Sequence, residues 1–152
     1  MAQSRARVFE YSVAIDGDGR ATTGEGANLD LPPEWTPEDL VLAGLVRCSL
    51  TSFAYHARRA GSQGSGGGSA HGKVTRREKD GRFAFVEIDC RLDVHLDPLF
   101  EGDALRELLA DAERDCFIGA SLTVKPGYNW RVNGGDVSSL RREDRRRYAA
   151  RR

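Results

Sequence analysis

The stretch TPEDLVLAGLVRCSLTSFAYHARRAG, residues 36–61, is typical of one long helix. Thr36 has the side chain of an N-cap, and Pro37 suits the first helical position, where the missing amide hydrogen costs nothing. Gly44 is the only glycine within the stretch before Gly61, which provides a C-terminal stop. The pattern therefore predicts a helix of about 24 residues, which corresponds to about 36 Å.

Most positions around this predicted helix are apolar or small. A helix that is apolar over most of its circumference is buried, so we expect it at the centre of the fold. The chain has 152 residues, which is the size of a single domain. We therefore predict one domain over residues 1–137, followed by a basic tail over residues 138–152.

Alternating and turn-forming residues precede the helix. Arg7–Ile15 alternates as a strand, and Asp16-Gly17-Asp18-Gly19 has the composition of a tight hairpin turn. Arg20–Gly24 and Leu29–Leu31 predict two further short strands. After the helix, the segment 61–72 (GSQGSGGGSAHG) is polar and rich in glycine, and we expect it to be a flexible loop.

The pattern resumes after the expected loop. A hairpin is predicted around Asp80-Gly81, and a single apolar stripe predicts a second helix. The remaining predicted segments are strands, and the whole series is Lys73–Lys79, Arg82–Leu96, a helix over Asp103–Asp115, Ile118–Lys125 and Tyr128–Val132. This order predicts an α+β fold, with a long central helix and a second helix against a mostly antiparallel sheet.

Charge is distributed unevenly along a chain of zero net charge. Residues 141–152 hold seven arginines against two acidic residues, so the rest of the chain is acidic. We interpret the tail as a solvated segment, with recruitment of an acidic partner as the alternative. An acidic body does not favour nucleic acid as a partner. Without an uninterrupted apolar run of about 18 residues or a secretory signal, we expect a cytoplasmic protein outside the membrane.

Three cysteines are the main candidates for chemistry. Their odd number argues against a structural disulfide framework, and their spacing matches no metal site. We therefore expect no metal and no cofactor. Cys48 lies on the seam of the long helix and Cys116 lies at the end of the second helix's stripe, so both thiols point inward. Core packing is the usual reading for such residues, with a redox pair as the alternative. Cys90, between Ile88 and Leu92, is expected in the core.

Two motifs resemble the OsmC/Ohr family of osmotically inducible and organic hydroperoxide resistance proteins. The family's long helix carries Asn-Pro-Glu-Glu/Gln-Leu, then small and apolar residues, then a cysteine. Pro37-Glu38 and Cys48 match this signature with the same spacing. The segment RDCFIGASLTV around Cys116 is similar to the second signature, a cysteine that closes the second helix. The order of elements agrees over residues 7–132.

This resemblance implies a bacterial thiol peroxidase that acts against oxidative stress. Cys48 would attack an organic hydroperoxide and become a sulfenic acid, Cys116 would form a disulfide with it, and a dithiol, often of lipoyl type, would reduce the bond. An arginine near the early turn would activate Cys48, and Glu38 would hold that arginine. Arg20 is the nearest candidate. The alternative is a non-catalytic member that binds a small hydrophobic ligand or senses oxidation.

The spacing of Glu38 and Cys48 has a consequence for assembly. Ten residues of straight helix separate them by about 15 Å along the axis. The two side chains cannot meet at one site within the same chain. If both serve one site, the glutamate comes from a second subunit, and a two-fold axis then generates two equivalent sites. We therefore expect an intertwined homodimer.

Overall fold

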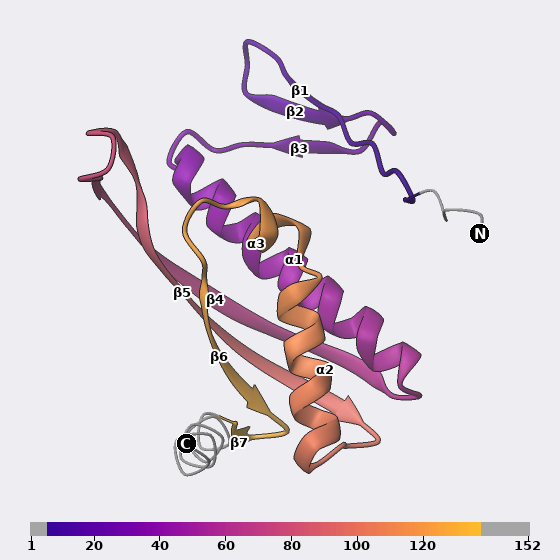
Figure 1. Ribbon diagram of the computed structural model, residues 1–152. Helices are drawn as coiled ribbons and strands as arrows, with labels where there is room; N and C mark the ends of the chain where they lie inside the picture. The colour runs from indigo at the N-terminus through magenta and orange to yellow at the C-terminus, as the bar shows by residue number, and fades with distance from the viewer. Residues whose placement is uncertain (1–5, 138–152) are drawn as a thin grey trace. The chain divides into compact units, whose positions relative to one another are not determined.

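The computed structural model describes residues 6–137. The chain divides into two compact units, Met1–Asp39 and Leu40–Arg152, which we describe separately. Figure 1 shows the elements in chain order, β1 Val13–Ile15, β2 Arg20–Thr23, β3 Asn28–Asp30, α1 Pro37–Arg59, β4 Gln63–Arg76, β5 Phe83–Asp97, α2 Gly102–Arg114, α3 Phe117–Ser121, β6 Gly127–Val132 and β7 Gly135–Asp136. The proposed basic tail over 138–152 lies outside the described residues.

The first unit contains a three-stranded antiparallel sheet in the order β1-β2-β3. Its first turn forms because the Asp16 carboxylate accepts hydrogen bonds from the amides of Asp18 and Arg20, and Gly19 adopts a φ of +83°. The predicted hairpin is therefore confirmed. Of the predicted first strand, residues 13–15 form β1, which pairs with β2.

The long helix α1 begins and ends where its caps predict. Thr36 Oγ1 accepts from the Asp39 amide, and the Asp39 carboxylate accepts in return from the Thr36 amide, which satisfies amides that the first turn leaves free. Gly61 has a φ of +86° just beyond the last turn. By length and composition α1 could also cross a membrane. A single helix of this kind among the described residues is weak evidence for a membrane span.

The second unit is a four-stranded mixed sheet in the order β4-β5-β6-β7, with helices packed on one face (Figure 1). β4 and β5 form the predicted hairpin, and β6 pairs parallel to β5. Alternate residues of β5 point into the core, in the sequence Ile88, Cys90, Leu92, Val94 and Leu96. α1 contributes Leu45, Phe53 and Ala57, and α2 contributes Leu105, Leu108, Leu109 and Ala112. The α+β fold class is confirmed.

The prediction of a flexible loop over residues 61–72 is wrong from residue 63 onward, where the chain is strand β4. Its glycines are a packing requirement. A Cβ at Gly64 would lie 2.8 Å from the Phe53 ring and 2.9 Å from Ala57 Cβ, and a Cβ at Gly72 would lie 2.5 Å from the Phe85 ring. Bare strand positions let α1 and neighbouring side chains approach the sheet closely.

The predicted strand over Ile118–Lys125 is also wrong. Residues 117–121 form the short helix α3, because the Cys116 side chain accepts a hydrogen bond from the Gly119 amide and acts as its N-cap. At the other end, the Ser121 hydroxyl donates to the Phe117 carbonyl. The second predicted helix and the final strand are confirmed as α2 and β6.

Candidate functional site

Cys48 of α1 and Cys116, the N-cap residue of α3, meet at the first turn of α3. The Ile118 amide lies 3.5 Å from Cys48 Sγ, and the Gly119 amide lies 3.3 Å from Cys116 Sγ. Successive backbone amides thus donate to the two sulfurs, and the neighbouring Cys116 is one of the groups that raise the pKa of the Cys48 thiol. The structure therefore brings together two of the predicted site residues, which lie 68 positions apart in the sequence.

The two thiols differ in their access to solvent. Cys116 is fully buried, whereas Cys48 is half-buried. Burial raises the pKa of the Cys48 thiol, the Ile118 amide opposes that rise, and the neighbouring Cys116 adds to it. None of the described residues of this chain supplies a positive charge that lowers this pKa. Within one chain Cys48 is therefore accessible but lacks the cation that would favour its thiolate.

A small polar layer lies beneath Cys116. The Ser49 hydroxyl donates to the Leu45 carbonyl at 2.9 Å, and its oxygen lies 3.5 Å from Cys116 Sγ. Tyr128 of β6 is 9% exposed and has Ser49 and Cys116 as neighbours of its hydroxyl. Cys90, opposite Tyr128 in the β5–β6 pair, is fully buried. Burial raises the pKa of Cys90 to about 11, as the expected core role requires.

A polar contact joins α1 to the residue before Cys116. His56 Nε2 lies 2.9 Å from Asp115 Oδ2. The Arg114 guanidinium holds the pKa of the Asp115 carboxyl below its usual range, and His56 contributes in the same direction. This contact links the last turns of α1 to the junction between α2 and α3. It therefore helps to fix the position from which Cys116 faces Cys48.

The other two predicted site residues belong to the first unit. Arg20 lies on β2, where its guanidinium Nε is 3.1 Å from Asp30 Oδ1 and both side chains are largely exposed. Glu38 is exposed in the first turn of α1. α1 is one unbroken helix from Glu38 to Cys48. The two residues therefore lie about 15 Å apart along the helix axis, as the sequence predicts. The roles of Arg20 and Glu38 stay predictions.

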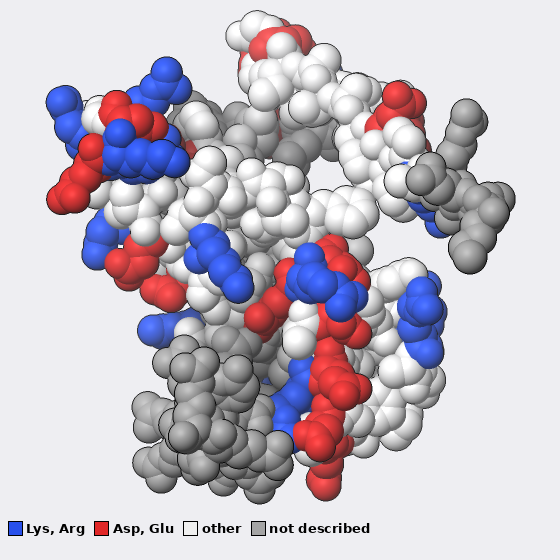
Figure 2. Space-filling model, viewed as in Figure 1, with Lys and Arg blue, Asp and Glu red and all other residues white. Residues whose placement is uncertain are grey.

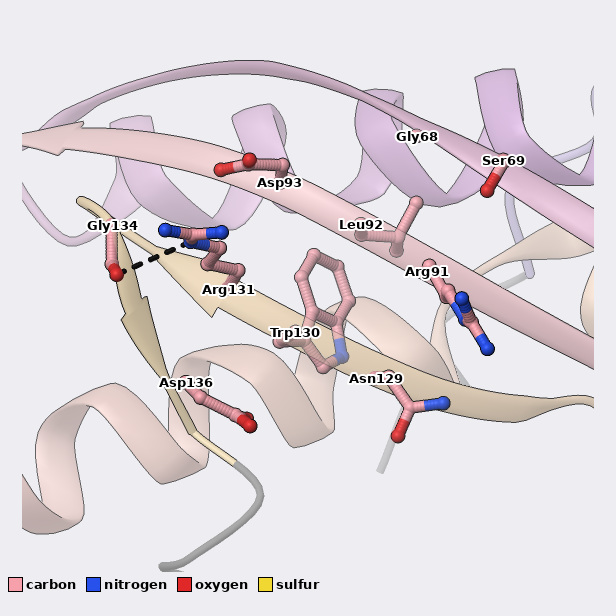
Figure 3. A pocket seen from close by; sticks show the side chains of 10 residues that line it. All are labelled: Gly68, Ser69, Arg91, Leu92, Asp93, Asn129, Trp130, Arg131, Gly134 and Asp136. Carbon is pink, nitrogen blue, oxygen red and sulfur yellow. Dashed lines mark hydrogen bonds between the residues drawn. The ribbon is translucent and has the colours of Figure 1, made fainter.

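A separate hollow of about 530 Å³ lies on the outer face of the β4–β5–β6 sheet (Figure 3). Its polar lining includes Ser69, Arg91, Asp93, Asn129 and Arg131. These residues alternate with Leu92 and Trp130, which are buried on the helix side. Because neighbouring strand residues point to opposite faces, this hollow is across the sheet from the thiols and contains no cysteine.

Charged side chains of both signs lie over α2. In the view of Figure 2, acidic side chains gather over α2, whose exposed residues include Asp103 and Glu107. Arg114 pairs with Asp111 on the same helix and with the C-cap residue Asp115. This face is therefore a mixture of opposite charges.

Within residues 6–137, no three His, Cys, Asp or Glu side chains are grouped as metal ligands.

The family model for OsmC-like protein matches residues 26–131, which is more than half of the chain. The chain belongs to the OsmC family. The match includes α1 with Cys48 and the α2–α3 junction with Cys116. The family prediction made from these two motifs is thus confirmed. None of the curated proteins compared with the chain matches it.

Solved structures of other OsmC-like proteins share the fold at low sequence identity. An OsmC-like protein of unknown function from Vibrio cholerae aligns with a TM-score of 0.68 at 15% identity, over 81% of this chain and 99% of that one. An OsmC-like protein from Mycoplasma pneumoniae gives 0.61 at 17% identity, over 83% and 97%. The organic hydroperoxide resistance protein OhrB of Bacillus subtilis gives 0.53 at 20% identity, over 82% and 98%.

Three features of the candidate site were not predicted from the sequence. The α3 amides were overlooked because the segment was predicted to be a strand. Ser49 was visible only as one small residue beside Cys48 on the helix. Tyr128 was assigned to a strand with no reason to connect it to Cys116. A serine next to a cysteine in a helix that the sequence predicts to be buried was the one available signal.

Proposed function

We propose that this chain is a thiol-dependent peroxidase that reduces organic hydroperoxides through Cys48 and Cys116. The observation that carries the proposal is the meeting of the two sulfurs at the first turn of α3. Membership of the OsmC family supports the reaction type. A structure of the same fold that is named an organic hydroperoxide resistance protein supports the substrate class.

In the proposed cycle the Cys48 thiolate attacks the O–O bond of the hydroperoxide. An alcohol leaves and Cys48 becomes a sulfenic acid. The Cys116 sulfur then attacks the Cys48 sulfur, so that an S–S bond forms, the S–O bond breaks and water leaves. A dithiol reductant, of the lipoyl type that the family resemblance implies, opens this bond by exchange and is itself oxidised to a disulfide.

Burial supports this division of roles. The thiol that meets the hydroperoxide must be reachable from solvent, and Cys48 is half-buried. The resolving thiol needs only to reach Cys48, so the complete burial of Cys116 is compatible with that role. Cys90 is also completely buried, and its pKa of about 11 leaves it almost entirely protonated near neutral pH.

We further propose that the working unit is a homodimer. α1 is strongly apolar, yet only 28% of its most apolar 18-residue window is buried within one chain. The first unit also exposes a series of large apolar side chains, namely Val8, Phe9, Tyr11, Val13, Ile15 and Leu29. Apolar surface of this extent indicates a binding partner. A second copy would cover it and would bring Arg20 and Glu38 to a Cys48 that lacks a cation.

Mixing two inactive variants tests whether the site is shared. We expect Cys48→Ser and Glu38→Gln each to lower hydroperoxide consumption when expressed alone. Co-expressed chains that pair at random should regain about a quarter of the wild-type sites, because half of the dimers are mixed and each holds one intact site. Hydroperoxide consumption by the purified mixture measures this recovery.

The control for that experiment is the mixture of Cys48→Ser with Cys116→Ser. We place both sulfurs of a site in the same chain, so no mixed dimer gains an intact site and no recovery is expected. A monomeric mass of 16.7 kDa by light scattering at micromolar concentration would contradict the dimer. Recovery in the control mixture would contradict the assignment of both cysteines to one chain.

The central test of the proposed peroxidase is a map of cysteine oxidation. Fully reduced protein treated with one equivalent of cumene hydroperoxide should form a Cys48–Cys116 disulfide within the dead time of hand mixing. Mass spectrometry of the digested protein locates the bond. The same treatment of Cys48→Ser should leave Cys116 reduced. Slow oxidation spread over all three cysteines would instead favour the non-catalytic ligand-binding or sensing function.

A further inference from the structure

The Tyr128 hydroxyl is a buried polar group without an obvious purpose. Tyr128 is 9% exposed, and among residues 6–137 its oxygen makes no hydrogen bond of good geometry. The great majority of buried side-chain polar atoms in folded proteins have a partner, so an exception needs an explanation. A phenylalanine would fill the same space without this cost.

The Tyr128 hydroxyl lies beside Gly119, as the sulfur of Cys116 does. A Cβ built on Gly119 would be 2.9 Å from the Tyr128 oxygen and 3.4 Å from Cys116 Sγ. The hydroxyl and the sulfur therefore flank the same bare Cα. After burial itself, Ser49 and Cys116 are among the side chains that affect the pKa of the Tyr128 hydroxyl. The tyrosine thus reaches from β6 to the α2–α3 junction.

The hydrogen bonds around Cys116 explain why Tyr128 is left over in the reduced protein. The Ser49 hydrogen is committed to the Leu45 carbonyl, so the Ser49 oxygen faces the sulfur as an acceptor for the thiol hydrogen. The Gly119 amide already donates to the same sulfur. A neutral thiol needs no further donor.

Loss of the Cys116 thiol proton changes which hydrogen-bond partners the sulfur needs. A negative sulfur then faces a serine lone pair and needs a donor in place of an acceptor. Burial raises the pKa of the Tyr128 hydroxyl, so it keeps its hydrogen near neutral pH. A hydrogen bond to a charged acceptor is about twice as strong as a neutral one. The spare hydroxyl is therefore suited to the ionised sulfur.

We propose that Tyr128 donates a hydrogen bond to Cys116 Sγ while that sulfur loses its proton and attacks the Cys48 sulfenic acid. The inference rests on the proposed peroxidase cycle. The S–S bond forms as the S–O bond breaks, and the Cys116 proton ends on the departing hydroxide as water. Cys48 is reduced from the sulfenic state as Cys116 is oxidised. Tyr128 keeps its own proton throughout.

The test separates formation of the sulfenic acid from its resolution. Reduced full-length protein is mixed with one equivalent of cumene hydroperoxide and quenched at intervals with a dimedone trap, and mass spectrometry counts trapped and disulfide-bonded Cys48. In Tyr128→Phe we expect trapped Cys48 to appear at the wild-type rate. Its conversion to the disulfide should slow by about tenfold, the usual effect of one charge-assisted hydrogen bond.

Two further variants and two readouts distinguish this role from a structural one. Tyr55→Phe removes an exposed tyrosine hydroxyl and should leave resolution unchanged. Gly119→Ala places a methyl group against the Tyr128 oxygen, and should slow resolution without adding to Tyr128→Phe. The pH profile of resolution should move to higher pH in Tyr128→Phe. Its melting temperature should not fall, because the deleted hydroxyl makes no hydrogen bond of good geometry among residues 6–137.

The possible results distinguish the proposed role of Tyr128 from the peroxidase cycle on which it rests. Wild-type resolution rate and pH profile in Tyr128→Phe, with normal sulfenic acid formation, would overturn the inference and leave the peroxidase cycle intact. The absence of any oxidised Cys48 in wild-type protein would overturn both. A lower melting temperature with slowed formation of the sulfenic acid would assign Tyr128 a packing role and also overturn the inference.

Discussion

Replacement of Cys48 with serine is expected to reduce hydroperoxide consumption to the uncatalysed background. A serine hydroxyl is a far weaker nucleophile toward the O–O bond than a thiolate, and neither of the other two thiols can take over. Cys116 and Cys90 are both fully buried. The measurement is consumption of cumene hydroperoxide in the presence of excess dithiol, with wild-type protein assayed in parallel.

Cys90→Ala is the matched control for this prediction. It also removes one thiol, but from a core position on β5 that faces Tyr128 in the sheet register. We expect it to lower stability moderately, as the loss of a buried sulfur does, and to leave hydroperoxide consumption within twofold of wild type. Background activity in Cys90→Ala together with retained activity in Cys48→Ser would transfer the nucleophile to Cys90 and refute the proposed mechanism.

The second large effect is expected at Gly64. Valine there would force its Cβ to within 2.8 Å of the Phe53 ring and 2.9 Å of Ala57 Cβ, both on fully buried side chains of α1. Overpacking of this kind costs about 3 kcal/mol. For a domain of this size the melting temperature should fall by about 6–12 °C. Urea and thermal unfolding of the Gly64→Val variant measure the loss of stability.

Gly67 provides the comparison within the same strand. A Cβ at Gly67 meets nothing within 4 Å. Gly67→Val should therefore change the free energy of unfolding by no more than about 0.5 kcal/mol, because valine is favoured in strands and has space here. A flexible segment would tolerate valine equally at both positions. Equal stability of the two variants would thus argue against the strand β4.

The contrast between α1 and β4 explains how far sequence reasoning reaches. α1 is specified locally, since Thr36, Asp39 and Gly61 cap it through bonds within a few residues. The glycines of β4 are specified by side chains of distant segments that leave no room for a Cβ, as Gly64 meets Phe53. Composition alone cannot distinguish glycines that provide flexibility from glycines that permit close packing.

The candidate site also contains residues that local sequence predicts and residues that it does not. Cys48 and Cys116 were recognisable because two motifs carry them at characteristic positions on their helices. The α3 amides and Tyr128 were not, because the local pattern of residues 118–125 favoured a strand, whereas the Cys116 side chain caps a helix there. Their contacts with the sulfurs depend on tertiary packing that no local pattern encodes.

The parallel pairing of β5 with β6 has a consequence for the order of folding. α1 and the β4–β5 hairpin need only contacts between neighbouring segments. The contact of Ile118 with Cys48 spans 70 residues, and β6 can join β5 only after α2 has crossed back over the sheet. Contacts between distant segments form late, since closing a long loop costs chain entropy. The meeting of Cys48 and Cys116, 68 positions apart in the sequence, is therefore expected among the later contacts to form as the chain folds.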